Sequence, residues 1–118
     1  MTDKEQCMKL AHLMREGCKL TKPVRGMMYA RSTGGGHFAC AIGAVLYAGA
    51  IGAVLYADGR EPNGKYAIES LVETYPVLNK KTGPIYNLLD DIMTKNDLND
   101  YSREAIADWL ETLEWPDE

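Results

Sequence analysis

The sequence predicts an all-α protein, with residues 1–118 forming a single helical domain: a small bundle of about five helices with a long apolar central helix. Apolar residues recur at helical spacing in several segments, and few windows alternate apolar and polar residues as strands do. The middle of the chain, residues 38–57, carries no charge. With 118 residues, 46% of them hydrophobic, the chain is long enough to bury one core without disulfides or metals.

The first predicted helix runs from Thr2 to Glu16. Thr2 and Glu5 have the spacing of a capping box, and Gly17 is expected to end the helix. Its predicted core residues are Cys7, Leu10, Ala11 and Met14. Residues 18–36 show no sustained period and contain Pro23 and several glycines, so this segment is predicted to be a loop.

The middle of the chain contains an exact tandem duplication, in which residues 41–48 recur as residues 50–57. A shift of nine residues turns a helix by about 900°, so the second copy faces away from the first. We therefore expect a long helix from about His37 to Ala57 that self-associates through its second side, making a homo-oligomer. The residues of that second side are Ile51, Val54 and Leu55. The alternative is two short helices that break at Gly49 and fold back within one monomer.

The same uncharged segment is long enough to cross a membrane. It is, however, rich in Ala and Gly and has no flanking cluster of basic residues or tryptophans. We therefore expect no membrane association.

Three further helices are predicted in the second half of the chain. The first spans Tyr66 to Thr74, the second begins at 82–84, and the third is capped by Ser102 after a polar turn, 96–101. The predicted apolar face of the first helix consists of Ile68, Leu71, Val72 and Tyr75. That of the second consists of Ile85, Leu88, Leu89, Ile92 and Met93. That of the third consists of Ala105, Ile106, Trp109, Leu110 and Leu113.

The net charge of −4 is unevenly distributed. Residues 86–118 contain ten acidic and two basic residues, whereas residues 15–37 contain five basic and one acidic residue. An acidic protein is unsuited to general nucleic-acid binding, which neutralises phosphates with basic side chains, so we expect no nucleic-acid partner. The acidic C-terminal third fits a basic protein partner or a solvated face.

The three cysteines, Cys7, Cys18 and Cys40, are an odd number, and the first residues do not resemble a signal peptide. Free thiols in a reducing, cytoplasmic location are expected. Cys40, one helical turn after His37, is a candidate nucleophile, although its apolar neighbours favour an inert core thiol. The His and Cys residues lack the paired spacings of a zinc site. We expect no catalytic residue, no metal and no cofactor.

A glycine-rich loop is expected to lead directly into the central helix. Backbone amides of such a loop at a helix N-terminus can bind an anion or another small ligand. The loop lacks the lysine of a phosphate-binding loop and the preceding strand of a dinucleotide site, so a merely flexible loop is the alternative. The candidate ligand-binding residues are Arg31, Ser32, Thr33, Gly34, Gly35, Gly36 and His37.

Two motifs resemble those of a family of small uncharacterised bacterial and phage helical proteins. The first is Cys-Ala-Ile-Gly-Ala at 40–44, and the second joins Asn-Asp at 96–97 to Ser-Arg-Glu-Ala-Ile-Ala-Asp-Trp at 102–109. Lys95 and Tyr101 stand where that family has Leu and, usually, Trp. The paired-cysteine knuckle of some members is absent between residues 66 and 85. The resemblance implies a small helical domain, often phage-associated, and no particular activity.

These observations predict a non-enzymatic interaction protein, such as a phage or prophage accessory factor, that acts through a protein partner. The alternative is a small-ligand or anion binding protein that uses the loop from Arg31 to His37.

Overall fold

Helix α1 (Asp3–Leu20) begins with the predicted capping box. The Thr2 Oγ1 accepts a hydrogen bond from the Glu5 backbone N–H at 3.1 Å, and Glu5 Oε1 accepts one from the Thr2 N–H at 3.3 Å. The predicted core residues of this helix, Cys7, Leu10, Ala11 and Met14, are all buried.

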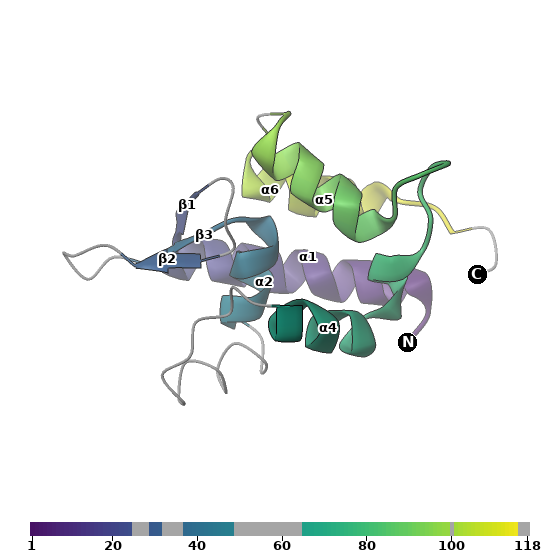
Figure 1. Cartoon of the computed structure of the whole chain (residues 1–118), viewed down its shortest axis with the longest axis horizontal. Coiled ribbons are helices and arrows are strands. Elements are labelled where there is room, and N and C mark those ends of the chain that lie inside the picture. The colour runs from purple at the N-terminus through teal and green to yellow at the C-terminus, as the bar shows by residue number, and fades with distance from the viewer. Residues whose placement is uncertain (25–28, 32–36, 49–64, 100, 116–118) are drawn as a thin grey trace.

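In this computed structural model, which describes residues 1–24, 29–31, 37–48, 65–99 and 101–115, the chain is mostly helical, as predicted (Figure 1).

The prediction that Gly17 ends the first helix is wrong, because α1 continues to Leu20. Gly17 is buried in the interior of the helix, where an added Cβ would overlap the backbone carbonyl of Ala44. The glycine is therefore required by the close approach of α1 to the next helix, α2 (Ala41–Ala48).

A small sheet, which is not predicted from the sequence, lies beside the C-terminal end of α1 (Figure 1). Its central strand β3 (His37–Ala39) pairs in parallel with β1 (Lys22–Pro23) and antiparallel with β2 (Tyr29–Arg31). Strands of two or three residues are too short to show the apolar–polar alternation by which strands are recognised in a sequence.

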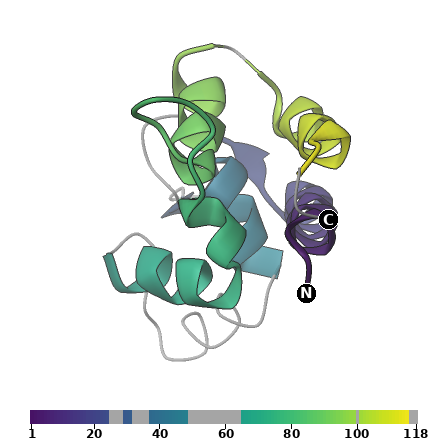
Figure 2. The same ribbon diagram turned by 90° about the vertical axis from the view of Figure 1, so that its right-hand side faces the viewer.

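Helix α2 is short and almost entirely buried, and it lies in the middle of the helices (Figure 2). Its buried side chains are Ala41, Ile42, Ala44, Val45 and Leu46. The predicted long central helix is not found: residues 37–39 form β3, and the described helix ends at Ala48. The second copy of the duplication, with Gly49, Ile51, Val54 and Leu55, lies outside the described residues.

Helix α4 (Lys65–Thr74) matches the predicted helix, and a short 3-10 helix, η1 (Pro76–Asn79), follows it. Helix α5 (Leu88–Asp97) begins several residues later than predicted. Its capping box joins the Asn87 side chain to the Asp90 N–H at 2.9 Å and the Asp90 carboxylate to the Asn87 N–H at 3.2 Å.

Ile85 and Met93 were predicted to be core residues but are 73% and 36% exposed. Ile85 does not lie on the helix, because the preceding chain forms a turn in which the Thr82 N–H donates to the Tyr86 carbonyl at 3.0 Å. Leu88 and Ile92 are buried as predicted, since their side of α5 faces the core.

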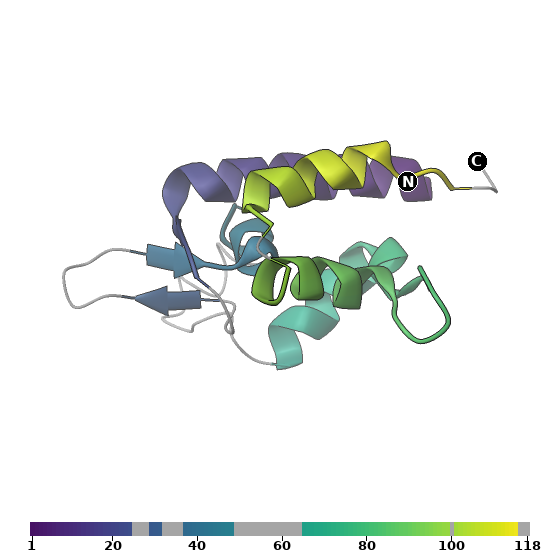
Figure 3. The same ribbon diagram turned by 90° about the horizontal axis from the view of Figure 1, so that it is seen from above.

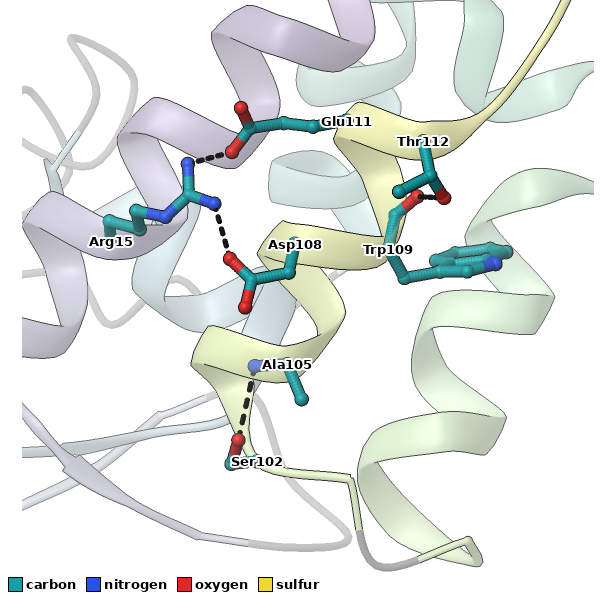
Figure 4. Close-up of polar contacts among 7 residues, drawn as sticks. All are labelled: Arg15, Ser102, Ala105, Asp108, Trp109, Glu111 and Thr112. Atoms are coloured by element: carbon teal, nitrogen blue, oxygen red, sulfur yellow. Dashed lines mark hydrogen bonds and ion pairs between the residues drawn. The ribbon is translucent and has the colours of Figure 1, made fainter.

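Helix α6 (Arg103–Thr112) begins at the predicted cap, where Ser102 Oγ accepts from the Ala105 N–H at 3.0 Å (Figure 4). It runs alongside α1 (Figure 3). Arg15 of α1 joins the two helices through ion pairs to Asp108, at 2.6 Å, and to Glu111 (Figure 4). Ile106 and Leu110 are buried as predicted, whereas Ala107 takes the buried position expected for Ala105.

Candidate functional site

Asn96 lies in the last turn of α5, not in the predicted polar turn, and is 5% exposed. Its Oδ1 accepts from the backbone N–H of Ala41 at 3.1 Å, and its Nδ2 donates to the Val24 carbonyl at 3.2 Å. The first bond satisfies an N–H at the start of α2 that has no partner within the helix. Asn96 therefore ties α5 to the start of α2 and to the segment after β1.

Arg103, the first residue of α6, is also 5% exposed. Its guanidinium donates to Thr21 Oγ1 at 2.7 Å, to the Thr21 carbonyl at 2.9 Å and to the Ala39 carbonyl at 3.2 Å. These bonds join the start of α6 to the end of α1 and to β3. All three acceptors are uncharged, and Arg103 forms no ion pair within the described part of the chain.

Asn96 and Arg103 belong to the second sequence motif, and the backbone groups of Ala39 and Ala41 flank Cys40 at the start of the first. The two motifs therefore meet at one place, which we call the motif junction: Asn96 and Arg103 with the backbone of Thr21, Ala39 and Ala41. Both residues belong to a recognisable sequence motif, but their burial is not predictable from the sequence. The spacing of polar residues around a turn does not reveal a distant backbone partner.

Cys40 lies next to the motif junction and is 6% exposed. Its Sγ accepts from the Gly43 N–H at 3.4 Å, a bond that favours the thiolate. Burial nevertheless has the larger effect and raises the pKa of the Cys40 thiol. A nucleophilic cysteine needs a lowered pKa, so this environment disfavours the thiol-enzyme alternative. Half-buried Cys18 has its pKa raised to about 11, also chiefly by burial.

The predicted ligand-binding loop is not at a helix N-terminus. Arg31 is the last residue of β2 and His37 is the first of β3, and the strand register places them opposite each other. Strand β3 and Cys40 separate the loop from α2, whose first N–H is bonded to Asn96. Ser32, Thr33, Gly34, Gly35 and Gly36 lie outside the described residues.

Three large apolar side chains are exposed on α5 and in the turn that precedes it. They are Ile85, Tyr86 and Met93, with exposed fractions of 73%, 55% and 36%, and we call them the α5 patch. Half-buried Leu89 and exposed Met93 are four residues apart on α5 and share one side of it, whereas Ile85 and Tyr86 lie in the turn before the helix begins at Leu88.

Within the described ranges, no group of three or more His, Cys, Asp or Glu side chains is placed to hold a metal ion. None of the helices described is both long and apolar enough to cross a membrane.

Comparison with known proteins provides no relative for this chain: no family model, no curated protein and no solved structure matches it. The resemblance to small bacterial and phage helical proteins therefore stays a prediction.

Proposed function

We propose that this protein is a non-enzymatic interaction protein that binds a basic protein partner through the α5 patch. The observation that carries the proposal is the exposure of Met93 on α5 together with Ile85 and Tyr86 in the turn just before this helix. Isolated exposed apolar residues are common in soluble proteins, whereas neighbouring ones are typical of contact surfaces. A phage or prophage accessory factor is the setting that the motif resemblance favours.

The charge around the α5 patch supports a basic partner. Helix α5 carries Asp90, Asp91 and Asp97 against a single basic residue, Lys95. The Lys95 ammonium lies 4.2 Å from the centroid of the Trp109 ring, so this side chain is directed toward α6. Lys95 follows Met93 by two residues, a separation that corresponds to a rotation of about 200° around a helix, so the two side chains lie on opposite flanks of α5. Lys81 donates to the Ile85 carbonyl at 3.3 Å, so one basic side chain lies beside the patch, and the acidic excess belongs to α5 itself. That excess would attract and orient a basic surface.

The experiment compares proteins captured from a bacterial lysate by the wild type and by the double variant Ile85→Ser/Met93→Ser. The matched control is Met8→Ser/Leu20→Ser, which removes two exposed apolar residues from α1. We expect one basic protein to be retained by the wild type and the control and lost by the patch variant. The purified partner should then bind directly, and more weakly at high salt. Equal capture by all three proteins would contradict the proposal.

A second candidate function is small-ligand or anion binding by the loop from Arg31 to His37. The observation in its favour is the strand register, which brings these two basic residues to the same end of the β2–β3 pair. Millimolar phosphate or a nucleotide should then raise the melting temperature of the wild type but not of Arg31→Ala. The absence of a shift in the wild type would remove this candidate.

Self-association is a separate proposal and is supported by the sequence duplication alone. Light scattering of the full chain, and of a chain that lacks residues 50–58, tests it. A full-length monomer at tens of micromolar would contradict self-association through Ile51, Val54 and Leu55.

A further inference from the structure

The ammonium group of Lys95 lies on two aromatic rings, and Lys95 forms no ion pair within the described part of the chain. Its Nζ is 4.2 Å from the centroid of the Trp109 ring and 5.5 Å from that of the Tyr101 ring. Asp91 lies one turn before Lys95, at a spacing that permits an ion pair, but its carboxylate accepts a hydrogen bond from Thr82. The two rings therefore hold an ammonium group by themselves, and we call them the ring pair.

The fold holds both rings in place without the help of the Lys95 side chain. Trp109 packs against the core and points from α6 toward α5 (Figure 4). The Tyr101 backbone N–H donates to the Lys95 carbonyl at 3.1 Å, which fixes Tyr101 against the last turn of α5. The Tyr101 side chain is 43% exposed, so the ring pair is open to solvent on one side. If the Lys95 side chain moves away, the ring pair stays in place and can accept another cation.

The chemistry of the ring pair favours a methylated ammonium over the primary ammonium of a lysine. The face of an aromatic ring attracts a cation through the ring quadrupole, and quaternary ammonium ligands are bound in this way. A lysine ammonium is strongly hydrated and loses water when it lies on a ring, whereas a quaternary ammonium has no N–H groups to hydrate and presents methyl groups to the ring. Three aspartates on α5, Asp90, Asp91 and Asp97, add a negative potential that also favours a cation.

We propose that the ring pair binds a small quaternary ammonium compound of the choline type, and that Lys95 occupies the site until this ligand displaces it. A cation–ring contact at an exposed site contributes a factor of about two to five to an equilibrium constant, so displacing Lys95 costs little. Lys95 then lowers the affinity for the ligand without closing the site. This inference does not depend on the proposed function, because Lys95 and Met93 lie on opposite flanks of α5.

The test uses the full chain with choline as the probe. The neutral control is the dimethylbutanol in which a carbon atom replaces the nitrogen of choline. We expect millimolar choline to shift the indole N–H signal of Trp109 in nuclear magnetic resonance spectra, and the neutral alcohol to leave it unchanged. Trp115 is the internal control, because the lysine near its ring, Lys80, is ion-paired to Asp3. No response to choline, equal responses to choline and the alcohol, or equal shifts of the two indoles would overturn the proposal.

Two variants test the roles of Lys95 and of the rings. Lys95→Gln should tighten choline binding about two- to fivefold, because it removes the competing ammonium. The matched control, Lys81→Gln, makes the same charge change in the segment before α5 and should alter the affinity less.

Tyr101→Leu keeps an apolar side chain but removes one ring, so it should weaken choline binding about two- to fivefold. Because Tyr101 is exposed, this variant should fold as the wild type does, and circular dichroism checks that it does. Equal affinities of Lys95→Gln and Lys81→Gln, or of a folded Tyr101→Leu and the wild type, would contradict the site.

Discussion

Gly17 of α1 faces the backbone of Ala44 in α2 so closely that no side chain fits between them. A glycine in the middle of a helix is destabilising in itself, because it loses more conformational freedom on folding than alanine does. Here it permits the two helices to pack with their backbones almost in contact. The same contact explains why α1 passes through a residue that usually ends helices.

Gly17→Ala is therefore expected to destabilise the protein, although alanine is the better helix former. The added methyl group would force α1 and α2 apart, and overpacking of this kind costs about 1–3 kcal/mol or more. Urea denaturation measures the loss. Gly83→Ala is the control, because an added Cβ there meets no atom within 4 Å. Its effect should be within about 0.5 kcal/mol. An unchanged stability for Gly17→Ala would contradict the close backbone contact between α1 and α2.

Asn96→Ala should lower the free energy of unfolding by about 2–4 kcal/mol, because it leaves the Ala41 N–H and the Val24 carbonyl without their partner. The control Asn99→Ala changes an exposed amide two residues beyond α5 and should have an effect of less than about 0.5 kcal/mol. Urea denaturation of both variants is the measurement. Equal, small effects would mean that the motif junction contributes little to stability.

Alkylation of the three thiols by iodoacetamide near neutral pH tests the thiol-enzyme alternative. Because burial raises the pKa values of Cys18 and Cys40, each should react at least about tenfold more slowly in the folded protein than in the unfolded chain. Cys18 is half-buried and should react before Cys40. Peptide mass spectrometry follows each site. Faster labelling of Cys40 in the folded than in the unfolded protein would restore it as a nucleophile.

The raised pKa of Cys18 also predicts a loss of stability in alkali. The thiol has an ordinary pKa of 9.0 and a pKa of about 11 in the folded protein. Between these values the folded state binds more protons than the unfolded state, so stability is full below pH 9.0 and falls as the pH rises toward about 11. Cys18→Ala should lose less stability than the wild type between about pH 9 and about pH 11 in urea titrations. Equal losses would show that the Cys18 thiol is not responsible.

The sequence by itself determined the mostly helical class and several helix boundaries, because these depend on local chemistry. The capping residues Thr2 and Ser102 start helices through hydrogen bonds that span three residues, and such bonds are visible as spacing in the chain. Helical periodicity also identified buried residues such as Leu10 and Ile106. In each case the interaction that decides the structure lies within one or two turns of the residue.

Only the tertiary structure decided the features that depend on distant contacts. Gly17 lies within a helix because Ala44 lies against it, and Ile85 is exposed because a turn keeps it off α5. The motif junction also depends on distant contacts. Asn96 and Arg103 are recognisable as motif residues, but their partners Ala41 and Thr21 are 55 and 82 residues away in the sequence. The burial of Asn96 and Arg103 arises from how elements pack together, and local spacing carries no information about that packing.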